Sequence, residues 1–290
     1  MTFADVVLAL IPYNFSPLIV IAFALVLGFY LMGVKRLTSH DRPGIGRVIT
    51  FLLGLGLCYG VLQTRFDFYA QHLFFAHRAQ HLIIHHVGPI LIALSNPLPV
   101  AHYWYRQLSA PLQAGLARLG RLYRFLQHPV IAALLFVGLV YLWLWPDIHF
   151  SAMRNRALYE LMNLSLLLEG LLFWWLMLDP RRPQSSVALG YGKRIIVLIA
   201  VMIPQIAIGA WITFQTEPLY DVYRLMEQPL NLEPIGDQLL GGILTWIPPA
   251  LMSVLGSLIL LSFIARDDRL DDQHRREQEN DAGANTAPVA

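Results

Sequence analysis

Residues 195–216 read IIVLIAVMIPQIAIGAWITFQT and contain no Asp, Glu, Lys or Arg. A helix needs about 20 apolar residues to cross the ~30 Å hydrocarbon core of a bilayer. This run is long enough and carries no charge, so it predicts a transmembrane helix. The whole chain has a similar character, because 56% of its residues are hydrophobic and only 14% are charged. Soluble domains carry roughly a quarter charged residues.

Several other stretches are also almost free of charge, and only Glu169 interrupts them. They are 6–34, 48–64, 79–105, 125–146, 161–178 and 238–265. We therefore predict an all-α integral membrane protein with about seven transmembrane helices. The expected spans lie near 16–34, 48–64, 79–96, 128–146, 159–178, 195–214 and 238–264.

The ends of the chain differ from the apolar middle. Pro12 and Pro17 interrupt the first apolar stretch, so residues 1–15 are expected to form a short periplasmic lead-in before a transmembrane domain at 16–265. The first residues lack a basic segment, so a cleavable signal peptide is not expected. Residues 266–290 are charged and then rich in Ala, Asn and Gly, which predicts a disordered cytoplasmic tail.

The basic residues gather on one side of the predicted spans. That side holds Lys35, Arg36, Arg42, Arg47, Arg106, Arg118, Arg121, Arg124, Arg181, Arg182, Lys193, Arg194, Arg266, Arg269, Arg275 and Arg276. The other side holds only Arg65, Arg78, Arg154, Arg156 and Arg224. Because basic loop residues favour the cytoplasm, the N-terminus is predicted outside and the C-terminus inside.

The connection 97–127 combines leucines and arginines at helical spacing. The leucines are Leu112, Leu116, Leu119 and Leu122, and Arg118, Arg121 and Arg124 lie between them. This pattern favours an amphipathic helix lying on the inner leaflet of the bilayer. A surface helix that merely links two spans is the alternative.

Histidines cluster where the third span enters the membrane from outside. They are His72, His77, His81, His85 and His86. Since His77, His81 and His85 recur every four residues, a regular helix would place them on one face. Imidazoles spaced in this way can bind copper, zinc, iron or nickel, although no Glu lies between them to support hydrolysis. Alternatively, they are interfacial residues bonded to backbone and water.

Other polar residues gather near the same face. Asp237 and Gln238 begin the seventh span and are candidate ligands, although a carboxylate there could simply cap the helix. The candidate metal ligands are therefore His77, His81, His85, His72, His86, Asp237 and Gln238. Glu169 lies deeper in the fifth span, where burial of its charge is costly, and its role could be structural or in proton relay.

Several motifs together resemble the CtaG family of cytochrome c oxidase assembly factors. They are H-x-x-Q-H at 77–81 followed by Pro89 and Pro97, the aromatic stretch 170–175, Pro218-x-Tyr220-x-x-Tyr223, and Asp237-Gln238 followed by Gly241, Gly242, Trp246 and Pro248. The resemblance covers about residues 46–250. It implies a bacterial inner-membrane protein that helps to mature a haem–copper oxidase, with copper handled on the periplasmic side. The implied partners are oxidase subunits, the lipid bilayer and a periplasmic copper carrier.

The chain also departs from the family pattern. Tyr159 and Asn163 stand where the family has an H-x-x-x-H pair, and Thr245 stands where a Met is common. His85 and His86 occupy positions that often hold methionines. The resemblance therefore implies a copper site built mainly from the third helix.

Two other functions compete with a non-enzymatic assembly factor. A copper or other metal transporter would use the histidines as its entry site and Glu169 deeper in its path. A membrane haem protein is disfavoured, because His128 and His149 are predicted at the inner end and in a loop. No P-loop, nucleophile elbow or carboxylate pair indicates an enzyme, and we expect no nucleic-acid partner.

The predicted topology can be tested with reporters. A reporter fused after Ala265 should be active in the cytoplasm, and one inserted between Glu217 and Leu232 should be active outside, because the predicted span 238–264 separates the two sites. If both reporters report the same compartment, the span count is wrong.

Overall fold

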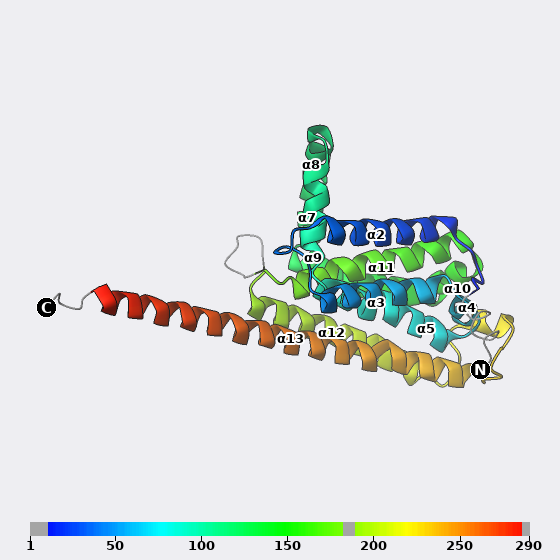
Figure 1. Cartoon of the computed structure of the whole chain (residues 1–290). Coiled ribbons are helices and arrows are strands. Elements are labelled where there is room, and N and C mark those ends of the chain that lie inside the picture. Colours follow the sequence, from blue (N-terminus) through cyan, green and yellow to red (C-terminus); the bar gives the residue numbers. More distant parts are fainter. Residues whose placement is uncertain (1–10, 182–188, 286–290) are drawn as a thin grey trace.

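A computed structural model describes residues 11–181 and 189–285, and this part of the chain is helical and contains no β-strand. Figure 1 shows long helices packed side by side in a bundle. In chain order the helices are α2 (Pro17–Arg36), α3 (Ile45–Leu62), α4 (Phe66–His72), α5 (Phe74–Leu82), the π-helical turn η1 (Ile83–Val87), α6 (Gly88–Leu94), α7 (Leu98–Gln107), α8 (Ala110–Leu126), α9 (Pro129–Leu144), α10 (Pro146–Arg154), α11 (Arg156–Leu178), α12 (Tyr191–Thr213), the 3₁₀ turn η2 (Asp221–Leu225) and α13 (Pro234–Asn285).

Several of these helices can cross a membrane. Within the described residues, α2, α3, α11, α12 and α13 are each long and apolar enough. The count rises to seven if α5–α6 with α7, and α8 with α9, are each taken as one bent span. The all-helical, multi-span architecture is therefore confirmed, and the seven spans predicted from hydropathy are the upper count. The orientation of the termini stays a prediction.

The predicted third span consists of three pieces, α5, η1 and α6. The π turn contains His85 and His86 and is followed directly by Gly88 and Pro89. Proline has no N–H to donate to the preceding turn, and this loss helps to explain why the regular ladder is interrupted here. Single π turns inside α-helices are frequent at functional sites.

Close helix contacts fix this interrupted span in the bundle. Gly88 lies against Cys58 of α3, so that a side chain at position 88 would collide with the sulfur atom. A Cβ atom added to Gly170 of α11 would lie only 2.5 Å from the carbonyl oxygen of His85. Glycine therefore lets α3 and α11 approach the backbone of the π turn and the residue after it.

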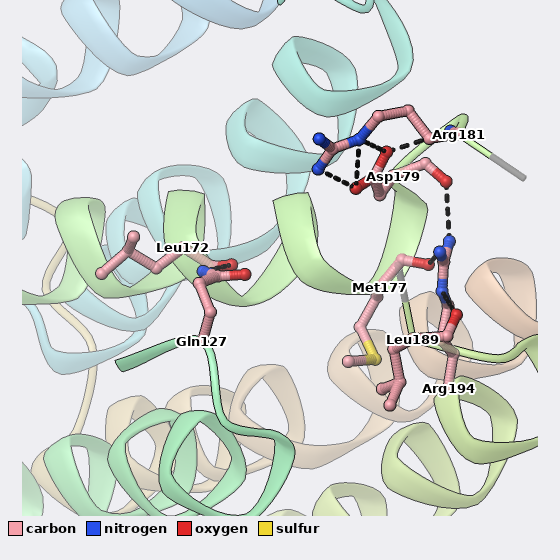
Figure 2. A network of polar contacts seen from close by, with 7 residues as sticks. All are labelled: Gln127, Leu172, Met177, Asp179, Arg181, Leu189 and Arg194. Atoms are coloured by element: carbon pink, nitrogen blue, oxygen red, sulfur yellow. Dashed lines mark hydrogen bonds and ion pairs between the residues drawn. The ribbon is translucent and has the colours of Figure 1, made fainter. Parts of the chain in front are cut away.

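Polar contacts close the end of the bundle where α11 finishes (Figure 2). The guanidinium of Arg194, on α12, donates to the carbonyl oxygens of Asp179, at 2.7 Å, and of Met177 and Leu189. Arg181 pairs with the carboxylate of Asp179. The last carbonyls of a helix have no partners within it, so Arg194 supplies donors for those of Met177 and Asp179.

Two segments follow the predictions only in part. The connection 97–127 forms two helices, α7 and α8, rather than one. The tail predicted to be disordered after Ala265 instead continues α13 to Asn285, beyond the bundle (Figure 1). Contacts within the helix favour this outcome, such as the ion pair between Arg275 and Asp272. Residues 1–10 of the lead-in and 286–290 of the tail lie outside the described residues.

The close contact at Gly170 predicts a position-specific loss of stability. Gly170→Ala should destabilise the bundle by about 1–3 kcal/mol, the usual cost of overpacking, because its Cβ atom would press on the backbone of His85. Gly138→Ala on α9 is the matched control, since no atom lies within 4 Å of its added Cβ. Thermal unfolding in detergent, followed by circular dichroism, measures both. Equal melting temperatures for the two variants would contradict the prediction.

Candidate metal-handling site

Three buried imidazoles meet beside α5, two of them on this helix. The rings of His77 and His81 lie one turn apart with their centroids 4.1 Å from each other. The ring of His149, on α10, lies 5.0 Å from that of His77. We call His77, His81 and His149 the histidine cluster. His149 was predicted in a loop, and no spacing in the sequence connects it with the third span.

Hydrogen bonds fix the orientation of two of these rings. Nδ1 of His81 lies 3.0 Å from Nη1 of Arg78, and its Nε2 lies 3.1 Å from Oδ1 of Asn163. Since a guanidinium only donates, Nδ1 accepts and Nε2 carries the proton. His149 donates from Nδ1 to the carbonyl oxygen of Trp143, and its Nε2 accepts from the hydroxyl of Tyr223, each at 2.9 Å.

His77 differs from its two neighbours. Its side chain is completely buried, and neither ring nitrogen forms a hydrogen bond of ordinary geometry among the described residues, although the backbone of Ala70 is near enough to interact with the ring. Leaving a buried polar group without a partner is costly. A neutral imidazole also keeps one nitrogen lone pair available. His77 is therefore the residue of the cluster that is best prepared to bind a further group.

Burial keeps the cluster largely uncharged. Burial lowers the pKa of His149 to about 4, and the nearby cation of Arg78 acts in the same direction. The hydrogen bond to the carbonyl of Trp143 opposes this shift without cancelling it. The His149 ring is therefore neutral at pH 7, the form in which an imidazole can bind a metal.

A polar network supports the cluster from α3, α4 and α11. The hydroxyl of Tyr159 lies 2.7 Å from Oδ1 of Asp67 and 2.9 Å from Oε1 of Gln80. Gln80 donates to the same carboxylate and to the carbonyl oxygen of Val61. Burial raises the pKa of Asp67, while these hydrogen bonds oppose the shift. Tyr159 and Asn163, which stand where the family has histidines, are thus hydrogen-bond partners here.

Asp237 and Gln238 are both engaged with backbone groups. The two carboxylate oxygens of Asp237 accept hydrogen bonds from the N–H groups of Phe74 and Phe75, each at 2.8 Å. Asp237 therefore caps the first turn of α5 from another helix. Gln238 accepts from the N–H of Leu219 and donates to the carbonyl oxygen of Glu217. These contacts favour structural roles for both side chains.

The remaining predicted ligands lie apart from the cluster. His72 bonds to the carbonyl oxygen of Phe68 on its own helix, and its ring packs on Phe68. His85 does not join His77 and His81, because the π turn intervenes, and it pairs instead with Glu169 at 2.9 Å. His86 packs beside Trp174, and its Nδ1 has no partner among the described residues.

A small cavity lies between His81 of the histidine cluster and the deeper pair His85 and His86. Its volume is about 10 Å³ and its walls include Arg78, His81, His85, His86, Gln205 and Thr245. This volume is near the minimum for one water molecule. No group of three or more His, Cys, Asp or Glu side chains in the described ranges is already arranged to hold a metal ion. Metal binding at the cluster would therefore require its rings to rotate.

Comparisons with known proteins identify the family. Residues 28–267 match the family model described as cytochrome c oxidase caa3 assembly factor (Caa3_CtaG). Proteins described as uncharacterized in Mycobacterium leprae (strain TN) and Mycobacterium tuberculosis (strain CDC 1551 / Oshkosh) are 28% and 27% identical to this chain. The alignments cover 85% and 87% of this chain, but only 38% of each relative. No solved structure matches the chain.

The family match extends over most of the chain and includes the histidine cluster. It confirms the resemblance that the motifs of the third, fifth and seventh spans predicted. This chain belongs to the cytochrome c oxidase caa3 assembly factor family.

Proposed function

We propose that this protein handles copper for a haem–copper cytochrome c oxidase, through the histidine cluster and without catalysing a reaction. The role in oxidase assembly follows from the family. The observation that carries the copper proposal is His77, which is fully buried, forms no hydrogen bond of ordinary geometry on either ring nitrogen and lies beside two further imidazoles. In this proposal copper is cargo that the protein receives and passes on.

The groups around the cluster favour a monovalent ion. The nearby carboxylates of Asp67 and Asp237 are occupied by hydroxyl, amide and backbone donors. The guanidinium of Arg78 bonds to His81 and is held in place by Oγ1 of Thr245 at 2.9 Å. A cation so close disfavours the addition of a second positive charge in a poorly solvated site. Imidazoles bind copper well, so Cu⁺ fits these surroundings better than a divalent ion.

The lack of a preformed geometry suits delivery better than storage. His81 and His149 each use the nitrogen that could bind copper to accept a hydrogen bond, from Arg78 and Tyr223 respectively. Binding would exchange these hydrogen bonds for copper contacts, and release would restore them. A carrier must release its ion to the oxidase or receive it from a periplasmic carrier, and this exchange lowers the cost of release.

A metal transporter is the second candidate, and a specific contact favours it. His85 and Glu169 form a buried pair below the cluster, and the small cavity reaches from His81 to His85. Polar and ionisable residues at membrane depth commonly mark ion pathways. A transporter would change the total or cytoplasmic copper of the cell, whereas an assembly factor would affect the oxidase alone.

Copper binding by purified protein provides the direct test. Wild-type protein should bind Cu⁺, and His77→Ala should weaken binding at least about tenfold, the low end of the losses caused by changing even the outer partners of metal ligands. His72→Ala is the matched control, because His72 is also buried near this face but lies outside the cluster. Competition with a Cu⁺ chelator measures the affinities. Equal affinities for wild type and His77→Ala would contradict a copper site at the cluster.

Oxidase activity in cells provides a second test. Cells that carry His81→Ala at normal abundance should make oxidase subunits but show low cytochrome c oxidase activity, because a copper centre stays empty. Excess copper should partly restore activity, since mass action can replace a carrier when free metal greatly exceeds the dissociation constant of the empty site. Full activity without added copper would contradict the copper proposal. Low activity that copper does not restore would favour a scaffold instead.

A further inference from the structure

Helix α8 lies outside the bundle. None of its side chains is buried, and Figure 1 shows α7 and α8 projecting away from the long helices. The chain bends by 77° between Phe74–Leu94 and α7, and by 75° between α8 and α9. Since the long helices follow the membrane normal, α8 runs nearly parallel to the membrane plane.

The two faces of α8 differ in chemistry. Its apolar stripe consists of Leu112, Leu116, Leu119 and Tyr123, which at about 100° per residue fall within roughly 60° of one another. All of them are well exposed. Its basic face carries Arg118, Arg121 and Arg124, centred about 180° from that stripe, together with the exposed ring of Phe125. Residues 98–126 contain no Asp or Glu, so nothing within α7 or α8 neutralises the arginines.

The bundle defines which face meets the hydrocarbon. Leu116 of the apolar stripe lines a groove of about 710 Å³ together with Phe29 of α2 and with Trp104 of α7. The indole N–H of Trp104 donates to the carbonyl oxygen of Phe29 at 2.9 Å, which ties α7 to α2. Because α2 is a membrane-spanning candidate with most of its surface unburied, the apolar stripe borders the lipid. The basic face is on the opposite side of α8, toward the headgroups and water.

We propose that α8 is a docking surface for anionic phospholipids of the leaflet in which it lies. Its leucines insert among the acyl chains, and its arginines bind the lipid phosphates. Charge complementarity selects this partner, because three arginines on a segment that contains no acid of its own match a negatively charged membrane surface. Together with α7, the helix connects α6 to α9, so its anchoring holds the spans that carry His86 and Phe136 at a fixed depth. This inference does not depend on the proposed copper function.

The depth of two α8 residues tests the orientation. Nitroxide labels are placed singly at Leu119→Cys and Arg121→Cys, in a Cys58→Ala background, on the full chain in nanodiscs that contain phosphatidylglycerol. The label at 119 should be accessible to oxygen but shielded from a water-soluble relaxation agent, and the label at 121 should show the reverse. The proposal would be overturned if both labels were accessible to the water-soluble agent. It would also be overturned if a protein partner shielded both labels from both agents.

Lipid affinity tests the role of the charges. Fluorescent phosphatidylglycerol is titrated into the full chain in neutral detergent. The triple variant Arg118→Gln/Arg121→Gln/Arg124→Gln should bind it about tenfold to a hundredfold more weakly than wild type. The bundle should remain folded, because α8 buries no side chain. Circular dichroism checks the fold.

A matched control isolates the position of the charges. Arg269→Gln/Arg275→Gln/Arg276→Gln removes the same charge from the extended end of α13 and should leave the affinity within about twofold of wild type. An unchanged affinity in the α8 variant, or an equal loss in the α13 variant, would overturn the proposal. Added salt should weaken wild-type binding, because exposed charges are screened.

Discussion

The histidine-bearing third span can lie inside an apolar bundle because other helices satisfy its polar groups. Asp237 caps the first turn of α5 from α13, Asn163 bonds to His81 from α11, and Glu169 bonds to His85 one level deeper. In a membrane, water is not available to replace these partners. The positions of α11 and α13 around α5 are therefore set by polar contacts as much as by apolar packing.

Several buried side-chain atoms in the described residues lack a hydrogen-bond partner, but among these side chains His77 is the histidine for which this holds at both ring nitrogens. Its side chain is fully buried, and the backbone of Ala70 is near the ring without forming a hydrogen bond of ordinary geometry. Beside the cluster, the buried side chains of Tyr159, Gln80 and Asp67 are all hydrogen-bonded. The ring of His77 stands apart from these hydrogen-bonded neighbours. This contrast is consistent with a site that receives a ligand at His77.

The sequence predicted the architecture well because hydropathy measures the property that the bilayer selects. Charge-free runs such as 195–216 became helices close to the expected bounds, and four of the five clustered histidines fell within the third span, while His72 ends α4 before it. Helical periodicity was less successful, because it assumed a regular helix through 77–85. The π turn breaks that regularity, so His85 pairs with Glu169 rather than continuing the face of His77 and His81.

Other features depend on contacts that no local pattern records. The hydrogen bonds from the start of α5 to Asp237 join residues more than 160 positions apart. His149 likewise reaches the histidine cluster from a distant part of the sequence, on α10. The tail was predicted disordered because its composition is charged, whereas pairs such as Arg275 and Asp272 sustain the helix. Composition describes the solubility of a segment, but the spacing of its charges decides whether it can be helical.

X-ray absorption spectroscopy of the Cu⁺-loaded full chain tests the central proposal most directly, because it reports the atoms bound to the metal. The histidine cluster predicts a shell of nitrogen neighbours with the outer scattering of imidazole rings, and this signature should be lost in a variant that lacks both His77 and His81. A sulfur shell from Cys58 or a methionine, or a spectrum that is unchanged without the two histidines, would contradict the proposed site.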